Sequence, residues 1–397
     1  MCWPLRWVQR WFTVPEASPS TRGRLSGFVL LAALLMLWQL SALYWVSSSN
    51  WPTVTDILRS MIDGFRSGEL PEVFLSSLYR MLSGYLVGTA ADKAGMPKAA
   101  VELLPTFYLP NAEGVLAAVT DSTPLIRRLE HEVAGRSALP PDPVLNFVDA
   151  LLEDFADEWL TKAMFHYRWK FAEGIDKAGD ILPQHFVGVS ADEAVLDATK
   201  AYFSQRQIAR LAVVGSNEHT AEMIEASYLR LVDLLDAHLR VQPFLMGQRP
   251  GASDFALYGQ LSQLAHFDPT SMALTLQRSR RVFAWVGLVE DLSGLEPTSS
   301  DWAHADALAP SLVALLQELA LGYVPVLLAN ARALAQGEKQ VSVQLPGGLW
   351  QQGEVPYQAK CLRWLRAQFA ALDAPHQASA RHILQSAGIA DLIDATL

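Results

Sequence analysis

Cysteine is scarce in this sequence, which has only Cys2 and Cys361 among its 397 residues. Because the two lie near opposite ends of the chain, they exclude a disulfide framework and a CxxC metal knuckle. None of the nine histidines has the spacing of an HExxH or paired-ligand motif, so the sequence predicts no metal site. This cysteine usage fits a reducing compartment. An isolated histidine such as His166 is expected to be a hydrogen-bonded, partly buried residue.

Charged residues are also few, at 18% of the chain against about a quarter in an average globular protein. The low charge content indicates that part of the chain either lies in a membrane or forms a large core. The net charge of −10 argues against a nucleic-acid partner, which requires clustered lysine and arginine. The length is enough for two or three domains.

A long hydrophobic run is present only near the N-terminus, where residues 28–46 read FVLLAALLMLWQLSALYWV without a charge. Nineteen helical residues match a hydrocarbon core of about 30 Å, and Tyr44 and Trp45 suit the interface at the far end. Four arginines and one acid, Glu16, precede the run. The positive-inside rule therefore predicts an inner (plasma) membrane protein with a cytoplasmic N-terminus. A signal peptide is the alternative.

A second membrane span is poorly supported. Residues 74–91 are apolar apart from serines and Arg80, whose charge is costly at a helix centre, and the apolar stretch ends before Asp92. No later uncharged run of 18 residues follows. The sequence therefore leaves two topologies for the C-terminal part. With one span it lies outside the cytoplasm, and with two spans it lies in the cytoplasm.

Residues 25–90 carry LWQL, then TVTDIL, then FRSGELPEVFLSSLYRMLSGYLVG, in that order. This succession resembles the opening of an ABC-importer permease of the nitrate/taurine/sulfonate type, which implies a transport component. Such permeases carry several more spans and a cytoplasmic loop that contacts the ATPase. Neither follows here, so the resemblance does not imply a working permease.

The segment 92–130 has the pattern of a hairpin followed by a helix. Residues 106–109 and 115–119 are short β-type runs separated by the turn residues PNAEG. Asp121, Ser122 and Thr123 are good N-caps, and Pro124 suits a first helical turn. A helix N-terminus with a hydroxyl and an acid beside it can hold an amino-acid-like ligand, although an ordinary capped helix has the same pattern.

This segment resembles the second half of the thioredoxin-like domain of glutathione S-transferases. The resemblance implies that the backbone of Leu104, before a cis Pro105, pairs with glutathione, while Asp121 and Ser122 hold its γ-glutamyl end. The first half of that domain should precede residue 92, but the permease-like residues stand there, with a seam near residues 89–92. The half that carries the thiol-activating residue is thus missing, and no catalytic residue is identified.

The following residues, 131–300, read as helical. FLMGQRPGASDFALYGQLSQL (244–264) resembles an element of the all-helical C-terminal domain of the same family. There Gly251 is expected at the N-cap and Asp254 at the third helical position of a capping box, which is a structural role. The resemblance also places Trp159, Phe165 and His166 beside the pocket of the electrophilic co-substrate. The alternative is an aromatic stripe that faces the core.

After residue 300 the pattern predicts a helical run over 303–335, a hairpin near 341–352 and an amphipathic helix that contains Cys361, expected to be a small buried hydrophobe. The predicted fold is mainly α: an all-helical glutathione-transferase C-terminal domain, a partial thioredoxin-like hairpin and helix, and an N-terminal transmembrane helix. The predicted boundaries are 1–91, 92–130, 131–300 and 301–397.

The function implied is that of a glutathione S-transferase-like protein, impaired because its catalytic half-domain is missing. Glutathione is the expected co-substrate, without a metal. A small-molecule electrophile, the membrane through residues 28–46 and a homodimer are the implied partners. Two alternatives stay open: a membrane-anchored, non-catalytic interaction module, and an ABC-type permease component.

Overall fold

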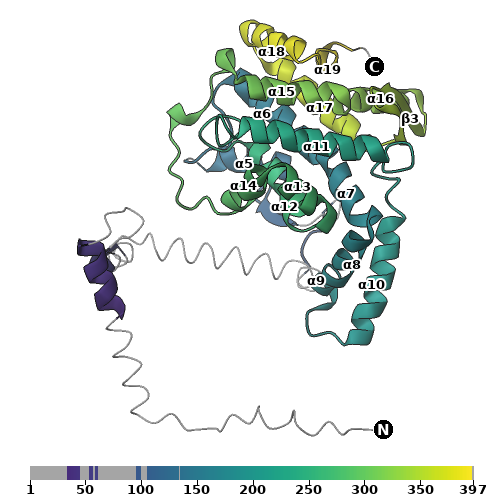
Figure 1. Ribbon diagram of the computed structural model, residues 1–397. Helices are drawn as coiled ribbons and strands as arrows, with labels where there is room; N and C mark the ends of the chain where they lie inside the picture. The colour runs from purple at the N-terminus through teal and green to yellow at the C-terminus, as the bar shows by residue number, and fades with distance from the viewer. Residues whose placement is uncertain are drawn as a thin grey trace, which may run out of the picture. The chain divides into compact units, whose positions relative to one another are not determined.

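The computed structural model describes residues 34–44, 53–56, 59–60, 95–99, 105–133 and 135–395. It divides the chain into two compact units, Met1–Asp121 and Ser122–Leu397. The described residues are mainly helical with two small antiparallel sheets, as the sequence predicts (Figure 1).

In the first unit, Leu34–Tyr44 form a helix that lies inside the predicted span. The other residues of that span, 28–33 and 45–46, lie outside the described residues, as does the whole of 74–91. The amide of Gln39 holds the short segment that follows: it donates to Thr55 Oγ1 at 3.0 Å and accepts from the backbone N–H of Thr55 at 3.1 Å.

The first unit ends with the predicted hairpin. Strands β1 (Phe107–Pro110) and β2 (Leu116–Val119) pair antiparallel, with Phe107 opposite Val119. Asn111 closes the turn, because its Oδ1 atom accepts from the backbone N–H groups of Glu113 and Val115 at 3.0 and 2.9 Å. Gly114 has φ +75°, a left-handed conformation that favours glycine.

The second unit is built from helices and one hairpin. Its first half contains α5 (Ser122–Glu132), α6 (Pro143–Phe155), the π-helical turn η1 (Ala156–Leu160), α7 (Thr161–Lys170), α8 (Ala172–Ile181), α9 (Gln184–Val187), α10 (Glu193–Ile208) and α11 (Ala221–His238). Its second half contains α12 (Ala252–His266), α13 (Pro269–Arg278), α14 (Arg280–Glu290), α15 (Pro310–Glu318), α16 (Tyr323–Gln336), β3 (Gln340–Leu345), β4 (Gly348–Gly353), α17 (Pro356–Ala371), α18 (Ala374–Ser386) and α19 (Asp391–Asp394). The short 3-10 turns are η2 (Ser299–Asp301), η3 (Ala305–Ala307) and η4 (Leu319–Leu321).

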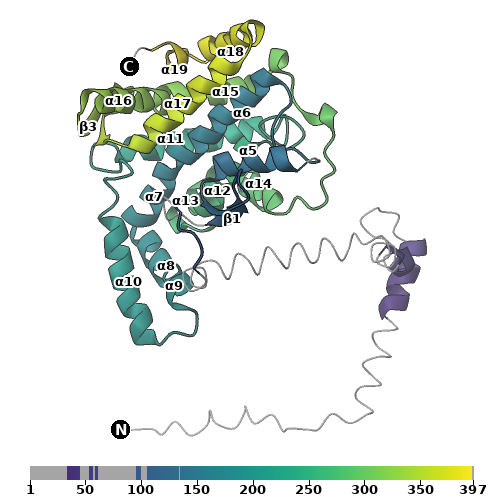
Figure 2. The same cartoon turned by 180° about the vertical axis from the view of Figure 1, so that it is seen from behind.

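Helix α6 is the central element of the core. Its start is defined by Asp142, whose carboxylate accepts from the N–H groups of Val144 and Leu145 at 2.9 and 2.8 Å, and by Pro143 in the first turn. Most of its side chains are buried, because α12, α17 and α18 pack around it. Figure 2 shows α17 running beside α6. The residues after position 300 therefore share one core with the helices before it.

One apolar segment of the second unit passes the length and composition test for a membrane span. It runs from Pro310 to Gln336, through α15 and α16, and its most apolar window of 18 residues has a mean hydropathy of 1.9. Within its most apolar window, 61% is buried inside the unit, against α11, β3 and α17. This segment is therefore a core element of the folded unit, and its apolar composition reflects burial on several sides.

Candidate functional site

A cavity of about 540 Å³ lies between α5, α6 and α17, wholly inside the second unit. This volume is in the range of small-molecule binding sites. Polar side chains from α5 and α6 form one side of the cavity, and mostly apolar side chains from α17 form the other. The lining residues are Thr123, Pro124, Arg127, Ala150, Glu153, Asp154, Cys361, Trp364, Leu365, Ala367, Gln368 and Ala371.

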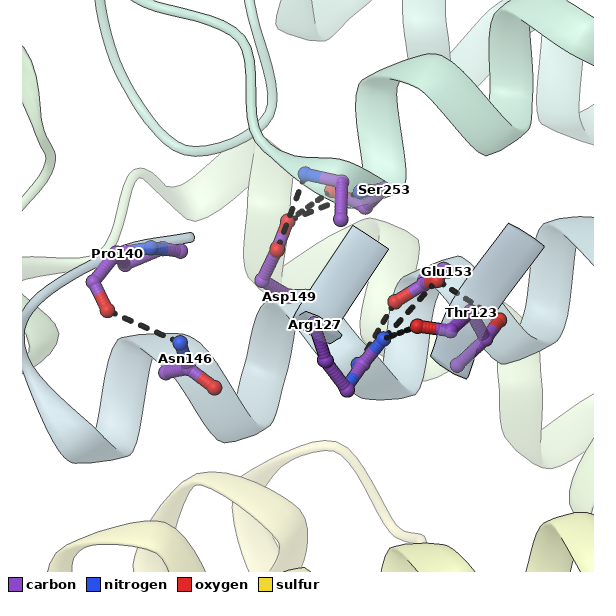
Figure 3. A network of polar contacts seen from close by, with 8 residues as sticks. Thr123, Arg127, Pro140, Asn146, Asp149, Glu153 and Ser253 are labelled. Atoms are coloured by element: carbon purple, nitrogen blue, oxygen red, sulfur yellow. Dashed lines mark hydrogen bonds and ion pairs between the residues drawn. The ribbon is translucent and has the colours of Figure 1, made fainter. Parts of the chain in front are cut away.

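The buried Glu153 organises the polar side of the cavity (Figure 3). Its carboxylate accepts from Arg127 Nη2 at 2.9 Å and from Thr123 Oγ1 at 2.9 Å. Arg127 Nη1 also donates to the backbone carbonyl of Thr123 at 3.0 Å. These bonds tie the first turns of α5 to α6 and neutralise both charges at the cavity wall.

The neighbouring carboxylate, Asp154, has different partners. It accepts a hydrogen bond from the hydroxyl of Tyr323 on α16. Burial raises the pKa of Asp154 to about 6, while hydrogen bonds from Tyr323 and from the Cys361 thiol oppose the rise. Cys361 is buried, as expected, but it lines the cavity and lies beside a carboxylate, which disfavours a thiolate. The cavity therefore offers carboxylate and thiol groups without an activated nucleophile.

The α17 wall is apolar except for one amide. Trp364 and Leu365 line it together with three alanines from α6 and α17. Gln368 stands among them, and its Oε1 atom is buried without a hydrogen-bond partner in the described part of the chain. A buried carbonyl oxygen without a donor is unfavourable, so this amide marks a place where a ligand N–H would be stabilised.

The residues expected to hold glutathione lie before and at the start of α5. Leu104 is outside the described residues, and Pro105 is exposed. Asp121 has φ +81° and is the only non-glycine residue with positive φ among those described. Ser122 is the first residue of α5 and is exposed. Asp121 and Ser122 are consecutive, and Thr123 and Pro124, which follow them, line the cavity.

The three residues expected beside the co-substrate do not come together. Trp159 is buried, donates to Ser227 Oγ at 2.8 Å, and lines a different cavity of about 280 Å³ near Arg230. His166 is fully buried, with Nδ1 2.8 Å from Ser216 Oγ and Nε2 3.0 Å from Glu225 Oε1.

Phe165 packs against Trp169 with their ring centroids 6.4 Å apart. Phe165 and His166 are neighbours in the regular helix α7, so their side chains point about 100° apart and meet different surroundings. Burial lowers the pKa of His166, which favours the neutral ring of a core histidine.

The N-terminus of α12 has the arrangement expected of Gly251 and Asp254. Gly251 is the N-cap, and its N–H donates to Asp254 Oδ2 at 2.9 Å. The other oxygen of Asp254 accepts from the N–H of Leu245 at 2.9 Å. Burial raises the pKa of Asp254 to about 8, against these backbone bonds. The residue is buried and holds the loop before α12, which is a structural role.

A third residue, Asp149 of α6, completes this cap and was not identified from the sequence. Its carboxylate accepts from the N–H groups of Ala252 and Ser253 at 3.2 and 3.1 Å and from Ser253 Oγ at 2.6 Å (Figure 3). These are bonds that an N-cap side chain makes in an isolated helix. The only signal in the sequence is an acid inside an otherwise apolar helical stripe, VLNFVDALL.

No protein-family model matches the chain, and neither the curated proteins nor the solved structures contain a match. Among the described residues, no group of three or more histidine, cysteine, aspartate or glutamate side chains could hold a metal ion.

Proposed function

We propose that the protein is a glutathione-binding member of the glutathione S-transferase type, with little or no conjugating activity. The proposal rests chiefly on the backbone conformation of Asp121. An aspartate with φ +81° is strained, and strained residues are concentrated at sites where a side chain must be presented in one direction. This strain falls on the acid that the resemblance assigns to the γ-glutamyl group.

One further feature supports the proposal. The hairpin β1–β2, the strained acid and the serine at the start of α5 follow one another in the order that the resemblance requires. The N–H groups at the start of α5 and the Ser122 hydroxyl would bind the γ-glutamyl carboxylate, and the Asp121 carboxylate would bind its ammonium.

Conjugation requires the glutathione thiolate, which attacks an electrophile. A group that hydrogen-bonds and stabilises this thiolate is not identified in the sequence. We therefore expect binding of glutathione with a conjugation rate close to that of free glutathione in solution.

Equilibrium dialysis with radiolabelled glutathione and the full chain in detergent tests the proposal. Asp121→Asn keeps a residue type that tolerates positive φ and removes the charge, so binding should weaken about tenfold without unfolding. The single variant Ser122→Ala should also weaken glutathione binding. Ser190→Ala changes an exposed serine elsewhere, serves as the control and should leave the affinity unchanged. Absence of saturable glutathione binding, or equal affinity in all four proteins, would refute the proposal.

The rate of conjugation is a separate measurement on the same protein. Glutathione and a chloro-dinitroaromatic electrophile should react at the uncatalysed rate in the presence of the full chain. Turnover well above that rate would show that a thiol-activating residue exists, and would contradict the expected impairment while leaving glutathione binding intact.

A second candidate function is a membrane-anchored, non-catalytic interaction module. The helix Leu34–Tyr44 favours it, because six of its leucine, methionine and tyrosine side chains are 41–75% exposed. An exposed apolar helix of this kind is stable in lipid rather than in water. Liposome flotation tests the anchor: Leu37→Arg should reduce the floating fraction, and Val195→Arg, an exposed apolar position on α10, should not. Flotation of Leu37→Arg as complete as that of the unsubstituted chain would refute the anchor.

The permease-component alternative stays a prediction from the sequence. Most of the residues that carry it, within 25–33 and 61–90, lie outside the described residues.

A further inference from the structure

The cavity between α5, α6 and α17 has an unequal set of charges and hydrogen-bonding groups. Three charged side chains line it: Arg127, Glu153 and Asp154. Arg127 is bonded to Glu153, so these two charges cancel. Asp154 accepts hydrogen bonds from neutral groups, the Tyr323 hydroxyl and the Cys361 thiol. Burial raises the pKa of Asp154 and Arg127 lowers it through space, but Asp154 forms no ion pair with any described residue. One carboxylate at the wall is thus left without a cation in contact.

The amide of Gln368 adds to the imbalance. Its buried Oε1 atom lacks a donor within the described ranges, so the wall presents a second unused acceptor. No lysine lines the cavity, and both Arg127 Nη atoms are already engaged by Glu153 and by the carbonyl of Thr123. A cation would be stabilised beside Asp154 and an N–H donor beside Gln368, whereas an anion would face the carboxylate of Asp154.

The rest of the cavity selects for an apolar body. Pro124, Trp364 and Leu365 supply broad hydrocarbon and aromatic surfaces, and the alanines leave the space between them open. Trp364 already has the ammonium of Lys360 4.2 Å from its ring centroid, so a ligand would meet this residue through apolar contact. Burial of apolar ligand surface supplies most of the affinity in such a site, and the few polar groups determine orientation.

We propose that this cavity binds an amphipathic amine, with its protonated nitrogen at Asp154 and its apolar body against the α17 wall. This amine site does not include Asp121 or Ser122, the residues assigned to glutathione.

The probes are 2-phenylethylamine and its neutral counterpart 2-phenylethanol, measured by equilibrium dialysis with the full chain in detergent at pH 7.5. The amine should bind about tenfold more tightly than the alcohol, since it alone forms charge-assisted hydrogen bonds. In Asp154→Asn the preference should fall to near unity. Asp197→Asn makes the same change at an exposed position of α10 and should keep the preference.

A second variant guards against a folding defect in Asp154→Asn. Ala367 lines the cavity and is exposed, so Ala367→Trp fills the space without replacing a core side chain. It should abolish binding of both probes while the circular-dichroism melting curve stays unchanged. Equal affinity for amine and alcohol, absence of saturable amine binding, or an unchanged amine Kd in Ala367→Trp would each overturn the inference. Glutathione binding should survive Ala367→Trp, and amine binding should survive Asp121→Asn, so the two proposals fail separately.

Discussion

The Oδ1 atom of Asp149 occupies the space that a Cβ atom at position 251 would need, and Gly251 leaves that space free. The N-cap of α12 is therefore divided between two residues: Gly251 supplies the backbone, and Asp149 supplies the side-chain acceptor from α6. Glycine at this N-cap is required by the neighbouring helix.

Gly251→Ser should destabilise the protein, although serine is a better N-cap than glycine in an isolated helix. The added side chain overlaps Asp149, and overpacking of this kind costs about 1–3 kcal/mol. Gly259→Ser in the same helix is the matched control, because a Cβ there meets no atom within 4 Å. It should be neutral or slightly stabilising. Urea denaturation measures both, and equal stabilities would contradict the divided cap.

In a protein that lacks the Asp149 carboxylate, Gly251→Ser should stabilise the fold instead of destabilising it. Asp149→Ala leaves the N–H groups of Ala252 and Ser253 buried without their acceptor, with an expected loss of about 2–4 kcal/mol. In that background the serine at position 251 no longer overlaps a carboxylate, and it brings its own hydroxyl to the cap. A double-mutant cycle in urea should therefore give a coupling energy above about 1 kcal/mol. Additive effects would show that the two residues act independently.

The buried ammonium of Lys162 should make the stability of the protein depend on pH. This ammonium donates to the carbonyl of Val214 at 3.1 Å and to Gln352 Oε1 at 3.0 Å, and burial lowers its pKa from 10.5 to about 8. Between these values the unfolded chain binds the proton more strongly than the folded one. The free energy of unfolding should therefore rise with pH above 8, by up to about 1.4 kcal/mol per unit.

Chemical denaturation at pH 7.5, 8.5 and 9.5 measures this dependence. In Lys162→Met the titrating group is gone, so the difference in unfolding free energy between the variant and the original chain should change by about 1–2 kcal/mol across the series. A difference that stays constant with pH would show that Lys162 does not titrate in this window.

Two ion pairs with the same geometry should differ in their contribution. Arg168 binds Asp268 through two bonds of 2.8 and 3.0 Å, and Asp268 is fully buried. Arg278 binds Asp233 through bonds of 2.9 and 2.8 Å, but both side chains are more than 40% exposed. Arg168→Leu leaves a buried carboxylate unpaired and should cost about 3–5 kcal/mol.

The matched change Arg278→Leu should cost less than about 1 kcal/mol, because water screens the pair and solvates the remaining carboxylate. Thermal and urea denaturation compare the two. Losses of similar size would mean that burial of Asp268 does not govern the contribution of its partner.

Features that depend on short-range patterns in the sequence are predicted correctly. The two hairpins and the mainly helical composition follow from alternation, turn residues and helical periodicity, which act over a few neighbours. The bond between Asp254 and Gly251 is of the same kind, since it spans three residues. Asp149 was missed because its partner Ser253 is 104 residues away, and no local pattern relates the two.

The sequence predicts the packing of longer segments against one another less well. A single helical run is predicted over 303–335, but α-helix begins only at Pro310. The structure also interrupts the run at Gly322, where a Cβ atom would overlap the ring of Trp159. The sequence does not indicate which ring packs there. The cavity was not predicted either, because it forms between three helices whose separation depends on packing. The placement of Trp159, Phe165 and His166 beside one pocket came from the resemblance alone, and the sequence does not indicate which neighbours these side chains contact.

The burial of Pro310–Gln336 also has a consequence for synthesis of the chain. Its neighbour α11 emerges from the ribosome before it, but α17, which covers α16, emerges afterwards. For the time needed to translate through Ala371, α16 is complete while one of its apolar faces is bare. A nascent chain arrested in that interval would present a hydrophobic helix to chaperones, to insertion machinery or to other copies of itself.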